Sequence, residues 1–345
     1  MNNPLDRREF LSKTGQGALL AGLLILGCGK SDSPEGGGKT SQRRFAVIPK
    51  GLTHEHWKAV EAGAKKAAAE VGNVEIIYKS AAKEDDTLQQ VNLVQSFVSS
   101  RVDGIIVAPL SDQALVPHIR LAVQAKIPVI VFDSPLAGQI GKDFVCYIGT
   151  DNYKAGVLGG QRLGQVMQGK GTVLLLRYAE SSASTREREQ GFLDALKKDY
   201  AGIAVIDPPQ YAGAEVNSAK KAAENMITAH LGKFDGVFCP NETSAAGMLI
   251  ALEDRQLAGK VRFVGFDANP RVIAGVRDRK VDGVVLQDPF KMGYQSVKQM
   301  LDHLAGKPVP PSTDTGAAVA TPENVDSPEI YRLLHPLEAT ASQGS

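Results

Sequence analysis

The sequence predicts an α/β protein of two lobes, each built on a doubly wound parallel sheet. The chain has 345 residues, which suits two domains at roughly 150 residues per domain. From residue 44 onward, short apolar runs alternate with longer amphipathic segments, and this pattern starts again near residue 150. Runs of Val, Ile and Leu without polar alternation are typical of strands that helices cover on both faces.

The first half of the pattern opens with the β-like run RFAVIPK at 44–50, and the segment at 53–71 that follows has the apolar spacing of a helix. Later apolar runs are short and rich in β-branched residues, and they predict strands at 74–79, 103–109, 128–133 and 144–151. The amphipathic segments between and after them predict helices at 84–100, 112–125 and 153–167.

The second half repeats this order after a turn near residue 170. Its apolar runs, of which TVLLLRY is the first, predict strands at 172–178, 204–208, 236–241, 261–267 and 281–288. The intervening segments predict helices at 185–199, 215–230, 244–255 and 270–279. The alternation of strands and helices favours parallel pairing, because a parallel connection needs a crossover that a helix supplies.

Many of the apolar strands end in a side chain that can hydrogen-bond or ionise. These strand-end residues are Lys50, Asp133, Asp151, Asn241, Asp267 and Gln287. Ligands of open α/β sheets bind beyond the carboxyl ends of the strands, so two lobes that face each other along these edges would share one polar cleft. Taken singly, each Asp or Asn could instead be a helix N-cap.

The composition and the failed motifs exclude several classes of function. Lys and Arg total 39 against 38 Asp and Glu, so the chain lacks the basic excess of a nucleic-acid-binding protein. The segment Gly164–Gly171 nearly matches a P-loop, but Gly171 stands where a Ser or Thr would bind magnesium, and the segment precedes a strand. His54 and His56 lack the spacing of a zinc motif. We therefore expect no metal and no cofactor, and the case for an enzyme is weak.

The first residues of the chain have the pattern of an export signal. Arg7-Arg8 in LDRREFLSK resembles the twin-arginine signal, and the apolar stretch from 15 to 27 is too short to span a bilayer. It ends at Cys28 in a sequence that resembles a bacterial lipobox, which predicts a signal peptide at 1–28 and lipidation of Cys28. Residues 29–43 contain no apolar run and predict a flexible tether. The alternative is a short membrane anchor with an incidental cysteine.

The other two cysteines, Cys146 and Cys239, lie inside apolar runs, where a small buried hydrophobic residue is the expected role. Three cysteines in 345 residues do not form a disulfide scaffold.

From about 44 to 335 the chain resembles the type I periplasmic sugar-binding proteins, and the ribose-binding group in particular. The matching stretches include IPKGLTHEHWKAVEAGA, VDGIIVAPLSDQAL, IPVIVFDSP, YIGTDNYKAG, SASTREREQGF, VFCPNETSAAGM, VGFDANP and VVLQDPFKMG. The resemblance implies an N-lobe of 44–150 plus 288–316, a C-lobe of 151–287 plus 317–335, three hinge crossovers near 150, 287 and 316, and a tail at 336–345. It also implies an ABC permease as partner and a small neutral sugar or polyol as ligand.

The resemblance also implies the binding residues. The matching positions are His54, His56, Trp57, Asp133, Arg188, Asn241, Asp267 and Gln287. His54 and His56 replace an Asn and an aromatic residue, and Ser134 and Ala108 replace an Arg and an Asn of the ribose binders. These departures argue against ribose itself and retain the sugar-like class. We expect His54 to be an uncharged group near the cleft mouth.

The chemistry of these residues suits a sugar. An ionised Asp accepts hydrogen bonds from neighbouring hydroxyls, an Arg donates two in a planar fork, and Trp57 can cover the apolar face of a ring. Because Asp133, Asp267 and Arg188 would be costly to bury alone, we expect them to pair across the cleft when it closes. The alternative for Trp57 is core packing.

Two other roles remain open for the same fold. A lipoprotein sensor would present the bound sugar to a membrane receptor, and a periplasmic sugar-processing enzyme would use paired carboxylates such as Asp133 and Asp267. The leading interpretation is a monomeric, lipid-anchored periplasmic solute-binding protein of an ABC importer.

Overall fold

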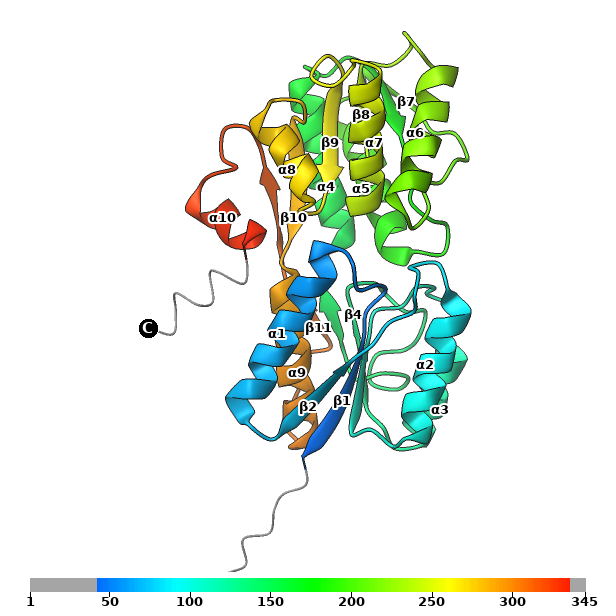
Figure 1. Cartoon of the computed structure of the whole chain (residues 1–345), viewed down its shortest axis with the longest axis vertical. Coiled ribbons are helices and arrows are strands. Elements are labelled where there is room, and N and C mark those ends of the chain that lie inside the picture. Colours follow the sequence, from blue (N-terminus) through cyan, green and yellow to red (C-terminus); the bar gives the residue numbers. More distant parts are fainter. Residues whose placement is uncertain (1–41, 336–345) are drawn as a thin grey trace, which may run out of the picture. The chain divides into compact units, whose positions relative to one another are not determined.

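The computed structural model describes residues 42–335 and contains two six-stranded sheets, which lie in separate lobes (Figure 1). The predicted signal peptide, Cys28 and the tail at 336–345 lie outside the described residues, as does nearly all of the predicted tether. Two α/β lobes built on parallel sheets confirm the fold class that the sequence predicts. Within the described residues, none of the helices has the length and apolar character needed to cross a bilayer.

The sheet of the first lobe has the order β11-β5-β4-β3-β1-β2, and all its pairs are parallel. Its strands are β1 (Arg43–Ile48), β2 (Val74–Tyr78), β3 (Gly104–Val107), β4 (Val129–Phe132), β5 (Tyr147–Gly149) and β11 (Ser312–Asp314). The strands β1, β3 and β4 are buried along most or all of their length, as continuous apolar runs predict.

The sheet of the second lobe has the matching order β12-β10-β9-β8-β6-β7. Its strands are β6 (Gly171–Leu175), β7 (Ile203–Ile206), β8 (Gly236–Phe238), β9 (Arg262–Phe266), β10 (Gly283–Gln287) and β12 (Ala317–Ala320). All pairs are parallel except that β12 lies antiparallel to β10 at the edge. An antiparallel edge strand on a parallel sheet is common in doubly wound folds.

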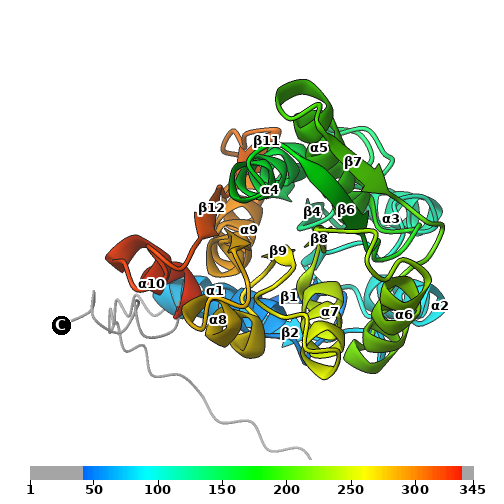
Figure 2. The ribbon, with the colours of Figure 1, turned by 90° about the horizontal axis from the view of Figure 1, so that it is seen from above.

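Helices cover both faces of each sheet (Figure 2). In the first lobe, α1 (Glu55–Val71) and α9 (Pro289–Leu304) pack on one face, and α2 (Thr87–Ser99) and α3 (Val116–Gln124) on the other. In the second lobe, α4 (Asn152–Val166) and α5 (Ala183–Asp199) lie opposite α6 (Val216–Ala229), α7 (Glu242–Asp254) and α8 (Pro270–Arg277). A short helix, α10 (Pro328–Leu334), packs beside β12 and the core of the second lobe.

The chain passes between the two sheets three times: from β5 to α4, from β10 to α9, and from β11 to β12. The sequence pattern predicts no individual element beyond residue 288, whereas the structure contains α9, α10, β11 and β12 there. The strands β11 and β12 are only three and four residues long, and the polar sequence Ser-Thr-Asp of β11 has no strand pattern.

Helices α4 and α5 of the second lobe pack unusually closely against each other. A Cβ atom at Gly156 of α4 would overlap the backbone carbonyl of Arg188 on α5, and one at Gly191 would overlap the carbonyl of Tyr153. Only glycine allows the two backbones this approach. The α4–α5 contact therefore sets the position from which the Arg188 side chain extends.

Cys146 and Cys239 are free and fully buried, as predicted. Burial raises the pKa of the Cys146 thiol to about 12, and it raises the pKa of Cys239 as well. Both cysteines therefore stay protonated and act as small apolar residues.

Candidate functional site

A polar cavity lies between the carboxyl edges of the two sheets. The first lobe contributes Lys50, His54, His56, Trp57, Glu84 and Asp133, and the second contributes Tyr178, Ser182, Ser184, Thr185, Arg188, Asn241, Glu242, Asp267 and Gln287. All eight residues that the sequence predicts as binding groups line this cavity, which we call the cleft. Its free volume is about 40 Å³. The sequence predicts that these eight residues lie together, and the structure agrees. Their role in ligand binding stays a prediction.

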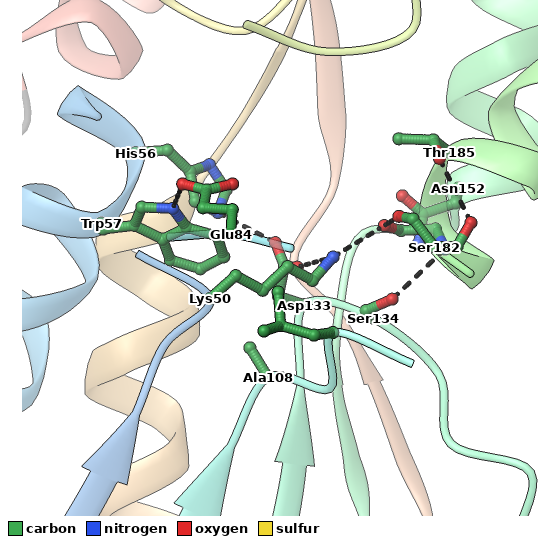
Figure 3. A network of polar contacts seen from close by, with 12 residues as sticks. Lys50, His56, Trp57, Glu84, Ala108, Asp133, Ser134, Asn152, Ser182 and Thr185 are labelled. Carbon is green, nitrogen blue, oxygen red and sulfur yellow. Dashed lines mark hydrogen bonds and ion pairs between the residues drawn. The ribbon is translucent and has the colours of Figure 1, made fainter. Parts of the chain in front are cut away.

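Asp133 follows β4 directly and carries the main charge cluster of the first lobe (Figure 3). Its Oδ2 atom lies 3.1 Å from Lys50 Nζ, and its Oδ1 atom lies 2.9 Å from His56 Nε2. Only 3% of Asp133 is exposed. Burial alone would raise its pKa, but the charge of Lys50 and the hydrogen bond and charge of His56 outweigh burial and hold that pKa well below its usual range. Asp133 is therefore an anion in the folded protein.

His56 is the second member of this cluster. Burial lowers its pKa, whereas the hydrogen bond to Asp133 and the charges of Asp133 and Asp267 raise it, and the net direction is upward. The His56 ring also meets Trp57 edge-on, with ring centroids 4.5 Å apart.

Asp267 follows β9 and carries the corresponding cluster of the second lobe. Its Oδ1 accepts a 2.6 Å hydrogen bond from Gln287 Nε2, and its Oδ2 accepts one of 3.1 Å from the backbone N–H of Glu242. Arg188 Nη1 lies 3.7 Å from Asp267 Oδ2. Charge-assisted contacts of this kind compensate for the cost of burying the carboxylate.

Arg188 is 3% exposed and held from several sides. Its Nε donates to Asn152 Oδ1 at 2.8 Å, its Nη1 donates to the carbonyl of Pro240 at 3.1 Å, and its guanidinium lies 4.0 Å from the centre of the Phe266 ring. The guanidinium is thus oriented before any ligand arrives, which lowers the entropy cost of binding.

The expected pairing of Asp133 with Arg188 across the cleft is wrong. Asp133 pairs with Lys50 and His56 inside the first lobe, and Asp267 pairs with Arg188 inside the second. Each lobe supplies its own counterions because they lie on the neighbouring strand end or helix. Consequently neither carboxylate depends on closure for a partner.

The expectation that His54 is uncharged is also wrong. His54 Nδ1 lies 2.9 Å from Glu84 Oε1. Burial lowers the His54 pKa, but the hydrogen bond and charge of Glu84, with the charges of Glu242 and Asp267, raise it to about 9. His54 is therefore a cation at neutral pH.

Trp57 belongs both to the cleft and to the core. Its Nε1–H donates to Glu84 Oε1 at 2.6 Å, its ring packs edge-on against Phe132, and 4% of it is exposed. Core packing and a place in the cleft wall are thus compatible for this residue.

Two of the strand-end residues are helix N-caps. Asn241 Oδ1 accepts from the N–H and the hydroxyl of Ser244 at the start of α7, which leaves its amide nitrogen as the group it offers to the cleft. Asp151 caps α4 through the N–H of Lys154 and does not line the cleft. For Asp151 the N-cap alternative is correct.

Two oxygen atoms at the cleft are buried without a hydrogen-bond partner: Glu242 Oε2 and Gln287 Oε1. Burial raises the pKa of Glu242, and the charge of Asp267 raises it further. The charge of His54 lowers this pKa, but the net direction is upward. Leaving a buried acceptor unsatisfied costs about 1–3 kcal/mol. These oxygens therefore favour a ligand that donates hydrogen bonds, as hydroxyl groups do.

Several cleft residues were not predicted as binding groups. Lys50 was recognised as a strand end, and Glu242 follows the predicted Asn241, so both had a positional signal. Glu84 lies in the loop between β2 and α2, and it reaches Trp57 and His54 only through tertiary packing, so no local pattern identifies it. Within residues 42–335, the His, Cys, Asp and Glu side chains form no group suited to a metal ion.

Comparison with known proteins identifies the family of this site. Residues 45–308 match the model of the family described as "periplasmic binding protein domain". The D-ribose/D-allose-binding protein of Pseudomonas aeruginosa is 26% identical over 316 residues, which cover 88% of this chain and 95% of that protein.

Solved structures agree with this match. An ABC transporter solute-binding protein from Agrobacterium vitis with bound D-fucose is 30% identical, with a TM-score of 0.81, over 84% of this chain and 99% of that one. A carbohydrate transporter solute-binding protein from Agrobacterium radiobacter, in complex with D-arabinose, is 28% identical, with a TM-score of 0.80, over 86% and 99% of the two chains. The two lobes, the cleft between their strand ends and these matches together show that the chain belongs to the periplasmic binding protein family, a family of substrate-binding proteins.

Proposed function

We propose that this protein is the solute-binding component of an ABC importer and captures a small sugar or polyol in the cleft. The observation that carries the proposal is the cleft, into which each lobe presents one buried carboxylate at a strand end. Asp133 is ionised, and Asp267 is paired with Arg188. The partnerless oxygens of Glu242 and Gln287 add acceptors for ligand hydroxyls. The relatives' names, which include ribose, allose, fucose and arabinose as ligands, support a sugar as the class of solute.

The proposed contacts follow from the hydrogen-bonding capacity of each residue. Asp133 and Asp267 accept from hydroxyls on opposite sides of the sugar, and Arg188 and the amide of Asn241 donate to its oxygens. Trp57 and His56 cover part of one ring face. Lys50 supports Asp133 and donates to Ser184 of the other lobe at 3.2 Å.

We further propose that the lobes open to admit the sugar and close on it. Ligand pockets of proteins measure roughly 300–1,000 Å³, far more than the free volume of the cleft, so entry requires the lobes to separate. Contacts between the lobes, such as Arg186 with Asp112 at 2.5 Å and Lys83 with Glu215 at 3.0 Å, would break on opening. The three chain passages are the hinges, with lobes of 44–150 plus 288–316 and 151–287 plus 317–335.

The beginning of the chain completes the proposal. Arg7-Arg8 and Cys28 favour export through the twin-arginine route and lipidation of Cys28, with residues 29–43 as tether. Two acyl chains hold a protein on a membrane where one gives only marginal binding. An anchored monomer would then deliver its sugar to a permease in the same membrane system.

A ligand screen on the purified full chain tests this function. Trp57 is the only tryptophan of the chain and lines the cleft, so its fluorescence reports on binding there. D-Ribose, D-allose, D-fucose, D-arabinose, D-xylose and myo-inositol are titrated, and calorimetry confirms each response. We expect saturable binding of at least one of them. Absence of binding by every compound at millimolar concentration would contradict the proposal.

A further inference from the structure

A second cavity of about 360 Å³ adjoins the cleft between α1, α8 and α10. The three helices lie close together in both views (Figures 1 and 2). We call this cavity the α10 groove. Its lining includes Ala59 of α1, Ile273 of α8, and Leu333 and Leu334 of α10. It therefore offers a largely apolar space beside a polar one.

Charges at the edge of the α10 groove are already neutralised by partners. Lys58 lies 2.8 Å from Glu55, and Arg277 lies 3.0 Å from Asp326. A charged guest would have to compete with these ion pairs, whereas an apolar guest would not. The groove thus favours a neutral, apolar occupant.

Three residues line both the cleft and the α10 groove: His56, Asp267 and Gln287. They form the partition between the two cavities, with the 2.6 Å hydrogen bond from Gln287 to Asp267 as its second-lobe part. His56 belongs to the first lobe, while Asp267 and Gln287 belong to the second. The partition therefore consists of side chains from both lobes, and a ligand that reaches both cavities passes between them.

The partition also contains an unused hydrogen-bond acceptor. Gln287 is 4% exposed, and its Oε1 atom has no partner. A hydrogen-bond donor of the ligand beside Gln287 Oε1 would satisfy this acceptor. The partition therefore offers a contact for ligand atoms and does more than separate the two cavities.

We propose that the solute is a sugar that carries an apolar substituent, and that the substituent lies in the α10 groove while the sugar lies in the cleft. This inference rests on the proposed sugar-binding function and adds the class of solute. The substituent is neutral, of the size of an aryl ring or a short alkyl chain, and it passes from the sugar over Gln287. Burial of an aromatic ring of this size corresponds to a gain in affinity of roughly tenfold to a hundredfold.

Matched pairs of ligands test the inference by calorimetry on the full chain. D-Fucose, D-galactose and D-xylose are each compared with their phenyl β-glycosides. We expect at least one phenyl glycoside to bind about ten times to a hundred times more tightly than its parent sugar. Leu334→Asp, which places a charge in the groove wall, and Ala59→Phe, which fills the groove, should each remove this advantage and leave the affinity for the parent sugar unchanged.

Leu231→Asp is the matched control, because Leu231 is exposed and lies outside the groove. It should retain the advantage, and thermal unfolding verifies that each variant is folded. If no phenyl glycoside binds more tightly than its parent sugar, or if the advantage survives both groove variants, the inference is wrong and the proposed function stands. If none of the compounds of the ligand screen and none of the glycosides binds the wild-type chain, the proposed function fails and this inference fails with it.

Discussion

Asp133 and Asp267 occupy equivalent positions in the two lobes. Asp133 follows β4 and Asp267 follows β9, and these strands hold the third place in the two sheet orders. Both residues have left-handed backbones, with φ of 62° and 69°, and both donate their N–H to the neighbouring strand, to Ile148 and Val285. Asp tolerates this conformation better than most residues, and such strain gathers at functional sites. The repeated turn aims one carboxylate from each lobe into the cleft.

The first prediction concerns Arg188. Arg188→Lys retains the charge but removes the fork that reaches Asn152 and the Pro240 carbonyl. We expect sugar affinity to fall by roughly tenfold or more and the free energy of unfolding to fall by about 1–3 kcal/mol. Calorimetry and denaturant titration measure the two effects. Arg271→Lys is the control, because its pair with Glu253 lies at the surface, and it should change neither.

The sequence could predict most of the fold because buried parallel strands have continuous apolar runs, as β3 and β4 do. It also identified Asp133 and Asp267, since strand ends of this fold point to the cleft. It could not predict which charges pair. The partners of Asp133 depend on how the end of β1 and the start of α1 pack against β4, and Glu84 reaches Trp57 from a loop without a sequence pattern. These contacts are tertiary, so they became visible only with the structure.

A second prediction follows from the pKa of His54. Its ordinary value is 6.5 and the folded value is about 9, so the folded chain binds this proton more tightly than the unfolded chain. The ion pair with Glu84 therefore stabilises the fold fully below pH 6.5, and this stability is lost as pH rises through 9. We expect the melting temperature of the wild type to fall over this window more steeply than that of His54→Asn.

His303→Asn, at an exposed site on α9, is the control for this comparison and should follow the wild type. Equal pH profiles for the wild type and His54→Asn would mean that the His54–Glu84 pair does not form in solution.

The third prediction concerns export. In the native host, mass spectrometry of the mature protein should find an acylated N-terminal Cys28, and Cys28→Ser should move the protein from the membrane to the soluble fraction. Cys146→Ser, at a buried site in the described part of the chain, should not alter the partition. A chain that retains Met1, or an unchanged partition of Cys28→Ser, would contradict lipidation.

The fourth prediction is closure. Small-angle scattering should give a smaller radius of gyration when the sugar found in the screen is present at saturation, because we propose that the lobes close as rigid bodies about the three chain passages. Asp267→Asn at the same sugar concentration should show a smaller change, since fewer molecules carry the ligand. An unchanged radius for the saturated wild type would show that the lobes do not move on binding.

We expect one sugar to contact the strand-end carboxylates of both lobes, and calorimetry with three matched variants tests these contacts. Asp133→Asn and Asp267→Asn retain side-chain shape and tolerate the left-handed backbone but remove the charge. Asp151→Asn changes the N-cap of α4, outside the cleft.

Loss of a charge-assisted hydrogen bond corresponds to about 1.5–3 kcal/mol, so each cleft variant should bind the sugar roughly tenfold to a hundredfold more weakly than the wild type. Asp133→Asn should show the larger loss, because it also leaves Lys50 and His56 without their counterion. Asp151→Asn should bind like the wild type. A folded Asp267→Asn variant that binds the sugar with unchanged affinity would show that the sugar does not depend on carboxylates from both lobes.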